Sequence, residues 1–165
     1  MNYTEPTTLK VAILDLYEGV ENQGMRCIRE ILNQFADSNH LNLEKTEFDV
    51  RLRHEAPGLD FDIYISSGGP GSPLDTEGND WEKKYFGWLS AVEAYNNNEA
   101  NVFKKKVFFI CHSFQLLCRH YGVGNVTKRK STAFGVFPVH SLPRAGTEQS
   151  FSRLKDPFYA VARTG

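Results

Sequence analysis

The sequence predicts a single α/β domain over residues 1–165, built on an open parallel β-sheet with helices on both faces. Two observations lead to this prediction. First, short apolar runs with strand character alternate along the chain with segments of helical periodicity, and this alternation is typical of parallel strands joined by right-handed helical crossovers. Second, a length of 165 residues with a hydrophobic fraction of 41% is sufficient for one core.

The first expected elements are a buried strand at residues 9–16 and an amphipathic helix at residues 24–36. The strand is a nearly continuous apolar run, as expected for a strand that is covered on both sides. The helix carries apolar residues at helical spacing, namely Met25, Ile28, Ile31, Leu32 and Phe35. The loop between them follows the carboxyl end of the strand.

Two further strands are expected before the middle of the chain. Residues 47–53 alternate Phe48, Val50 and Leu52 with polar residues, which indicates an edge strand. Residues 61–66 form the next expected strand. It ends in the segment Ser-Ser-Gly-Gly-Pro-Gly-Ser-Pro at residues 66–73, whose glycines and prolines predict a tight loop.

The remaining expected elements are a helix, a strand, a second helix and short β-like pieces. Asp80 is the expected N-cap of a helix that runs to about Asn96. A strand at residues 107–110 leads into a helix that closes near Gly122, a suitable C′ residue. Residues 134–139 are rich in residues that favour strands.

The junction at Cys111 is the most informative part of the chain. The apolar strand stops at this residue, and amphipathic helical spacing begins directly after it. A strand that turns sharply into a helix at a single Cys or Ser is typical of a nucleophile elbow, which places the side chain at the carboxyl edge of a parallel sheet. The start of a helix also favours the thiolate form. The sequence therefore predicts a reactive thiol at Cys111.

The glycine-rich loop is expected to face this thiol, because the strands that end at Ser66 and before Cys111 finish at the same edge of the sheet. A thiolate that attacks a carboxamide creates an oxyanion, and two backbone N–H groups usually stabilise it. Gly69, followed by Pro70, suits one donor because glycine permits close approach. The N–H of His112 is the expected second donor.

Charge and cysteine content narrow the classes of function. The chain has 19 basic and 20 acidic residues and a net charge of −1, so we expect neither nucleic-acid nor membrane binding. The three cysteines, Cys27, Cys111 and Cys118, fit neither a disulfide framework nor a zinc site. We therefore expect no metal, no cofactor and a reducing, cytoplasmic location. Cys27 and Cys118 are expected to be buried as small apolar residues.

Residues 67–73 and 110–115 resemble, in order and spacing, two motifs of the class I glutamine amidotransferase domain, a flavodoxin-like module found in GMP synthase and anthranilate synthase. Residues 14–17 and 22–24 resemble the opening of its GMP-synthase-like members. The resemblance covers nearly the whole chain. It implies an enzyme that hydrolyses glutamine through a cysteine thioester and supplies ammonia to a synthase domain or subunit.

The resemblance also implies roles for individual residues of this chain. Cys111 would be the nucleophile, the amides of Gly69 and His112 the oxyanion hole, and Gly68, Gly71 and Gln115 the substrate-binding residues. The family pattern Gly-x-Cys-x-Gly-x-Gln is not fully kept, because Phe109 and Ser113 stand where the family has glycines.

The family's general base is absent from its usual motif. That base is a histidine beyond the elbow with an acidic residue two positions later, and none of His112, His120 and His140 has an acidic residue at that spacing. Domains with this resemblance continue through further strands before the histidine. We therefore expect a domain that is incomplete at the C-terminus and inactive or impaired alone.

Two other functions are open at this stage. A related group of cysteine-elbow proteins, DJ-1/PfpI-like, uses the thiol on carbonyls, peroxide or peptides and places a glutamate of the first helix against it, for which Glu30 is the candidate. The other alternative is a non-catalytic domain that senses glutamine or binds a partner without turnover.

Overall fold

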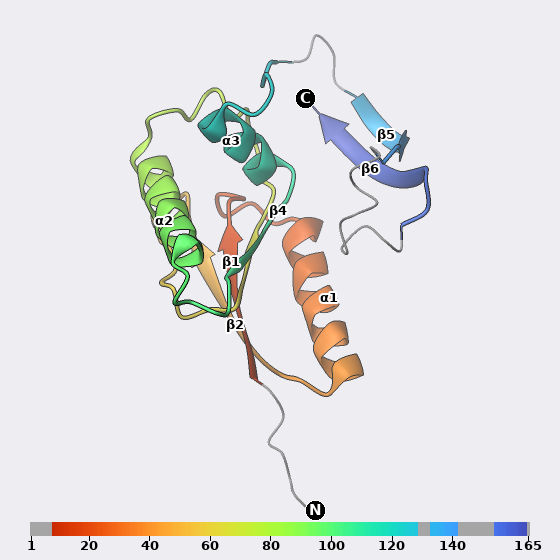
Figure 1. Ribbon diagram of the computed structural model, residues 1–165. Coiled ribbons are helices and arrows are strands. Elements are labelled where there is room, and N and C mark those ends of the chain that lie inside the picture. The colour runs from red at the N-terminus through yellow and green to blue at the C-terminus, as the bar shows by residue number, and fades with distance from the viewer. Residues whose placement is uncertain (1–7, 129–132, 142–153, 165) are drawn as a thin grey trace, which may run out of the picture. The chain divides into compact units, whose positions relative to one another are not determined.

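The computed structural model describes residues 8–128, 133–141 and 154–164, and within them a parallel four-stranded sheet (Figure 1). The strand order is β2-β1-β3-β4, and every neighbouring pair is parallel. The four strands are β1 (Thr8–Asp15), β2 (Asn42–Asp49), β3 (Ile63–Ser66) and β4 (Lys106–Phe109). All four carboxyl ends therefore lie at one edge of the sheet.

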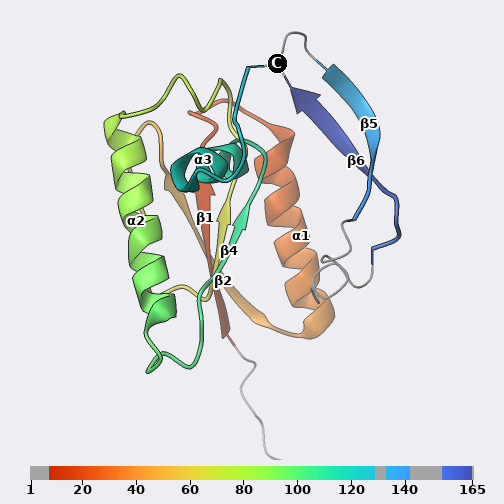
Figure 2. The same ribbon diagram turned by 45° about the horizontal axis from the view of Figure 1, so that its top comes forward.

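Three helices cover the two faces of this sheet, as Figure 2 shows for α1 and α2 on opposite sides. They are α1 (Gln23–Asn39), α2 (Asp80–Asn97) and α3 (His112–Tyr121). Val11 and Ile13 of β1 pack in one apolar cluster with residues of α1, whereas Ala12 and Leu14 pack in another with residues of α2 and α3. This alternation follows from the period of two in a strand. The predicted α/β fold with helices on both faces is confirmed.

Local chemistry explains where α1 begins and ends. The side chain of Asn22 accepts a hydrogen bond of 2.7 Å from the Met25 N–H, which caps the first turn. The helix ends at His40, whose φ of 53° is left-handed. The helix thus extends beyond the predicted residues 24–36 at both ends. α2 begins one residue earlier than expected, since Asn79 rather than Asp80 is its N-cap.

The predicted edge strand at residues 47–53 was wrong in position. The strand is β2, at Asn42–Asp49, and it does lie at an edge of the sheet. The carboxylate of Asp49 accepts a hydrogen bond of 3.0 Å from the N–H of Leu52, which forms a side-chain-closed turn directly after the strand. Leu52 is 56% exposed, so the alternation of apolar residues that predicted a strand here does not correspond to a buried face.

The chain divides into two compact units, Met1–Val126 and Thr127–Gly165. The second unit contains β5 (Ala133–Val139) and β6 (Phe158–Thr164), which pair in antiparallel register. In this unit His140 Nδ1 lies 3.4 Å from an Asp156 carboxylate oxygen, and both side chains are exposed. A single domain over residues 1–165 stays a prediction. Among the described residues, no helix has both the length and the apolar character needed to span a membrane.

Candidate functional site

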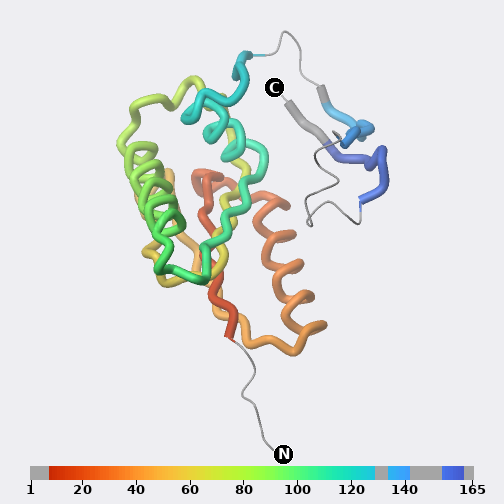
Figure 3. The backbone as a smooth tube through the Cα atoms, in the orientation of Figure 1, coloured from red at the N-terminus to blue at the C-terminus, as the bar shows by residue number. Residues whose placement is uncertain are grey.

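Cys111 follows Ile110 in the short turn between β4, which ends at Phe109, and α3, which begins at His112. Figure 3 traces the backbone along this part of the chain. Its φ of 52° and ψ of −102° lie outside the regions that residues with side chains prefer. The residue is exposed. A strained turn that presents an accessible sulfur at the carboxyl edge of the sheet is the geometry of a nucleophile elbow.

Ser113 ties this turn to the neighbouring strand. Its Oγ accepts a hydrogen bond of 2.9 Å from the Ile110 N–H and lies 2.9 Å from the carbonyl oxygen of Ser66 and 3.1 Å from that of Ile110. The single hydroxyl hydrogen can be donated to one of these carbonyls at a time. Ser113 is fully buried, so a small side chain is accommodated where the family has glycine. Phe109 is half-buried and packs against the core cluster on the α2 and α3 side.

The glycine-rich loop after β3 lies directly against the elbow. A Cβ placed on Gly68 would lie 3.6 Å from the Cβ of Cys111. The loop is also fixed to the end of β1, because Ser67 Oγ accepts a hydrogen bond of 2.9 Å from the Leu16 N–H. The structure therefore brings Gly68 and Cys111 together from strand ends that are about 40 residues apart in the sequence.

Two glycines of the loop are required for different reasons. A Cβ on Gly69 would come within 2.5 Å of the carbonyl oxygen of Leu16, so this position permits no side chain without movement of the backbone. Gly71 has a φ of 82° and open space around it, so its requirement is conformational. Gln115 follows on α3 and is half-buried, and its backbone N–H donates a 3.0 Å bond to the Cys111 carbonyl.

Arg51 supports the loop from outside the sheet, and sequence reasoning missed it. Its Nη1 donates a hydrogen bond of 2.8 Å to the Pro70 carbonyl, and its Nη2 lies 3.1 Å from a carboxylate oxygen of Glu18. The guanidinium lies over the ring of Trp81, 5.3 Å from its centroid. The Arg51 side chain is 9% exposed, whereas that of Glu18 is 46% exposed, so solvent screens the ion pair from the Glu18 side.

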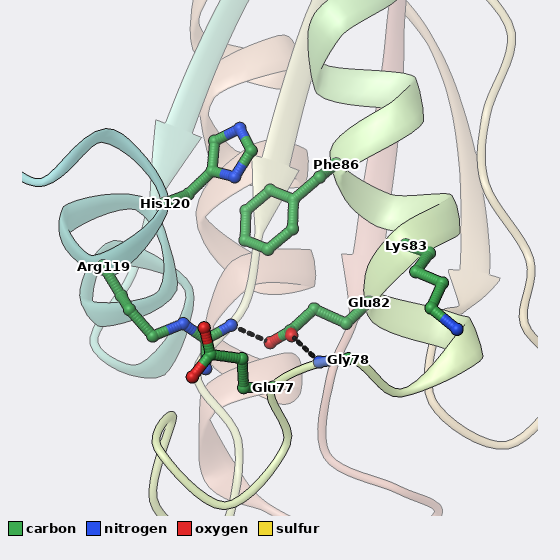
Figure 4. A pocket seen from close by; sticks show the side chains of 7 residues that line it. All are labelled: Glu77, Gly78, Glu82, Lys83, Phe86, Arg119 and His120. Carbon is green, nitrogen blue, oxygen red and sulfur yellow. Dashed lines mark hydrogen bonds and ion pairs between the residues drawn. The ribbon is translucent and has the colours of Figure 1, made fainter.

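Arg119 supports the other end of the loop and was also missed. Its guanidinium donates a hydrogen bond to the Pro73 carbonyl. It also pairs with the carboxylate of Glu82, as Figure 4 shows. Glu82 is 3% exposed and accepts two more hydrogen bonds of 3.2 Å, from Thr76 Oγ1 and from the Gly78 N–H. A buried ion pair thus fixes the loop between Pro73 and Gly78 to α2 and α3.

A cavity of about 260 Å³ lies beside this ion pair. Seven residues line it, from the end of the loop, α2 and α3: Glu77, Gly78, Glu82, Lys83, Phe86, Arg119 and His120 (Figure 4). The ring of His120 stacks on that of Phe86, with centroids 3.9 Å apart. Lys83 pairs with Asp80 at 2.9 Å. Cys111 does not line this cavity, and neither do Gly68, Gly69 and Gly71.

The imidazole of His112 is buried beneath the elbow and is 1% exposed. Burial first, and then the positive charges of Arg51 and Arg119, lower its pKa to about 4. The backbone of Gly71 lies close enough to favour protonation slightly, but neither ring nitrogen has a hydrogen-bond partner of good geometry among the described residues. The ring is therefore neutral at neutral pH.

The other cysteines differ from expectation. Cys27 is exposed, so the prediction that it is buried was wrong, and Cys118 is half-buried. Cys27 lies on α1, whose buried positions are Met25, Ile28, Leu32 and Ala36. Within the described residues, no three metal-ligating side chains gather in one place.

Comparison with solved structures supports the fold. A glutamine amidotransferase from Thermotoga maritima superimposes with a TM-score of 0.65 at 13% identity, over 95% of this chain and 60% of that chain. The protein SMU.1228c gives 0.56 at 21% identity, over 95% and 62%. A glutamine amidotransferase from Methylobacillus flagellatus gives 0.54 at 16% identity, over 95% and 54%.

These likenesses confirm the flavodoxin-like fold of glutamine amidotransferase structures for this chain. The chain spans about three fifths of the length of the solved structures that it matches. No family model matches the sequence, and no curated protein matches it by sequence comparison. The fold is therefore established by structure, and the activity is argued from the site.

Proposed function

We propose that the chain carries the glutamine site of a class I glutamine amidotransferase, with Cys111 as nucleophile. The sulfur attacks the side-chain amide carbon of glutamine, the amide nitrogen gains a proton and leaves as ammonia, and water then hydrolyses the glutamyl thioester to glutamate and free thiol. The observation that carries this proposal is the exposed Cys111 in a strained turn, packed against Gly68 of the glycine-rich loop.

The glycine-rich loop and the start of α3 supply the remaining groups of the proposed site. The amides of Gly69 and His112 would stabilise the oxyanion. In the described part of the chain, neither amide donates a backbone hydrogen bond that would compete for it. Gly68, Gly71 and Gln115 would line the place of the substrate. The arginine contacts at Pro70 and Pro73 favour this role, because a loop held at both ends keeps its donors oriented before substrate arrives.

The proposal includes low activity of this chain alone. His112 is neutral, but its ring is buried with no hydrogen-bond partner among the described residues, and no histidine after the elbow has an acidic residue two positions later. Without a base, thiolate formation and proton transfer to the leaving ammonia are both slowed. The ammonia would be used by a synthase domain or subunit of a GMP-synthase-like system in the cytoplasm.

The peroxide- and carbonyl-directed alternative depends on a glutamate against the thiol. Its candidate, Glu30, instead pairs with Arg26 at 3.3 Å on the exposed side of α1 and accepts a 3.2 Å hydrogen bond from Gln34. This pairing favours the amidotransferase proposal over the DJ-1/PfpI-like alternative.

The test is covalent labelling with an electrophilic glutamine analogue such as 6-diazo-5-oxo-norleucine, read by peptide mass spectrometry. We expect an adduct at Cys111 that free glutamine prevents, and no adduct at Cys27, which is an exposed cysteine of the same chain and an internal control. Equal labelling of both cysteines without protection by glutamine would contradict the proposal. A protected adduct without ammonia release would identify a glutamine-binding domain that lacks turnover.

A further inference from the structure

Tyr17 lies beside the proposed nucleophile, and although residues 14–17 carry part of the family resemblance, the proposed mechanism gives this side chain no role. Its phenol oxygen lies 3.0 Å from the position that a Cβ on Gly68 would occupy, and the Cβ of Cys111 lies 3.6 Å from that same position. Tyr17 lies two residues after the end of β1, so a third strand end contributes to this edge of the sheet. The phenol and the cysteine are therefore neighbours across Gly68.

Two glycines make room for this ring. A Cβ on Gly24, in the first turn of α1, would collide with the phenol oxygen of Tyr17, and a Cβ on Gly68 would crowd it from the loop. The backbone of Tyr17 is fixed as well, because its N–H donates a hydrogen bond of 2.8 Å to the carboxylate of Asp15. The ring thus has a defined place between α1 and the glycine-rich loop.

The phenol has a hydrogen to donate. Within the described part of the chain its oxygen makes no hydrogen bond, although the side chain is half-buried. Burial first, and then the negative charges of the Cys111 thiolate and of Asp15, raise the pKa of Tyr17 above its ordinary value. The hydroxyl therefore keeps its proton throughout the pH range in which a thiol ionises.

We propose that the Tyr17 hydroxyl, which has no hydrogen-bond partner among the described residues, donates a hydrogen bond to the Cys111 sulfur once the thiol has ionised, and so holds the sulfur in its reactive form and position. A hydrogen bond to the charged form of an acid favours ionisation, and bonds from O–H groups to anions are among the stronger ones in proteins. The inference deepens the proposed function, since it assigns a positioning residue to the same site. It requires that Cys111 reacts as a thiolate, and it makes no use of glutamine.

The other charged groups near this pair come from β1, β2 and α1. Asp15 faces Tyr17 directly, and Asp49, Glu47 and Arg29 act on Asp15 in turn. Arg29 and Glu47 form a paired bridge at 2.6 and 2.7 Å. Of these groups, only Asp15 and Cys111 carry charges that change the pKa of the Tyr17 phenol. Removal of the hydroxyl should therefore change the environment of the Cys111 thiol and have little effect on Asp49, Glu47 and Arg29.

The experiment measures the rate of alkylation of Cys111 by iodoacetamide against pH, in the full chain and in Tyr17→Phe. We expect the midpoint of the rate profile to move upward by about one pH unit, which corresponds to roughly a tenfold lower rate on the rising part of the curve. Alkylation of Cys27 in the same samples should be unchanged. Tyr121→Phe, which removes a phenol on α3 that binds Glu93, is the matched control and should leave the Cys111 profile as in the parent chain.

A second variant tests the proposal without removing the phenol, so that an effect of misfolding can be recognised. Gly24→Ala keeps the phenol but displaces it, so we expect the Cys111 midpoint to rise in this variant too, with circular dichroism unchanged. An unshifted midpoint in a folded Tyr17→Phe chain would overturn the inference. Failure of the amidotransferase proposal is seen separately, as loss of glutamine protection against the analogue, and it would leave the Tyr17 effect on alkylation intact.

Discussion

At the scale of single residues, the site combines one strained backbone position with side chains that hold it in place. The φ of 52° and ψ of −102° at Cys111 cost on the order of 1–3 kcal/mol relative to a relaxed conformation. The hydroxyl of Ser113 offsets part of this cost, because it bonds to the backbone of Ile110, directly before Cys111, and to Ser66 of β3. The conformation of the turn at Cys111 therefore depends on the hydroxyl group of Ser113.

His112 should make the stability of the fold sensitive to acid. Its pKa is about 4 in the folded chain and 6.5 ordinarily, so the neutral buried ring contributes its full stability above pH 6.5. That contribution is lost as the pH falls from 6.5 to 4, by at most about 3 kcal/mol. In urea unfolding at a series of pH values, His112→Leu should show a shallower decline over this interval than the parent chain. Parallel curves for the two proteins would contradict the assignment.

Gly69 should tolerate substitution less well than any exposed glycine. In Gly69→Ala the new methyl group meets the carbonyl oxygen of Leu16, and we expect a loss of about 1–3 kcal/mol in the free energy of unfolding, with slower labelling of Cys111. The control is Gly87→Ala in α2, where a Cβ meets nothing within 4 Å. It should stabilise the chain by up to about 1 kcal/mol. Similar destabilisation by both changes, in chemical unfolding, would argue against the close approach.

At the scale of elements, the loop between β3 and α2 is the part of the fold that joins the sheet to the site. It approaches β1 at Gly69, contacts Arg51 at Pro70, and is tied to α2 and α3 through Arg119 and Glu82. These contacts hold the backbone of the loop, and therefore its N–H groups, in a fixed orientation. The orientation of the loop therefore depends on residues that lie outside its own sequence.

The Arg119–Glu82 pair should be costly to break from one side. In Arg119→Met the carboxylate of Glu82, only 3% exposed, loses its charge partner, and we expect a loss of about 3–5 kcal/mol in chemical unfolding. Adding Glu82→Gln to that variant should recover part of the loss. The exposed pair of Lys83 and Asp80 is the control, and Lys83→Ala should change stability by at most about 1 kcal/mol. Equal effects of Arg119→Met and Lys83→Ala would show that the buried pair does not support the loop.

An element could be predicted from the sequence where the spacing of its own apolar residues matches a helix or a strand. β1, β3, β4 and the three helices follow from apolar periodicity, and the elbow follows from the change of period at Cys111. The position of β2 did not follow, because its polar residues face outward at an edge while Val50 and Leu52 continue an apolar alternation past the turn at Asp49.

The supporting residues of the site could not be predicted in the same way. Arg51 and Arg119 act on Pro70 and Pro73 through contacts between residues 19 and 46 positions apart, and a single arginine has no motif. Tyr17 belongs to residues 14–17, which carry part of the family resemblance, but its place beside Cys111 follows only from the order of the strands. Residues in a recognisable motif were found from the sequence, whereas residues that act across the fold required the structure.

At the scale of the whole molecule, stability is centred on the strand that both core clusters share. Residues Val11, Ala12, Ile13 and Leu14 of β1 are each 0% exposed, and β1 lies between β2 and β3. The loops of the site all leave the sheet at the ends of its strands. A rigid central strand with functional loops at its edge is the usual arrangement of open α/β folds.

Hydrogen exchange should therefore separate the centre of the sheet from its edges. We expect the amides of Val11–Leu14 to exchange slowest, at a rate set by global unfolding, and those of the edge strands β2 and β4 to exchange faster. Mass spectrometry on peptic fragments measures this directly. Stronger protection of β4 than of β1 would contradict the strand order described here.

A crystal structure of the covalent adduct with a glutamine analogue would test whether Cys111 and two backbone amides form one acyl-transfer site. We expect a bond to Cys111 Sγ with the carbonyl oxygen of the analogue within about 3 Å of the amide nitrogens of both Gly69 and His112. An adduct whose carbonyl oxygen points to solvent, with neither amide in reach, would contradict it.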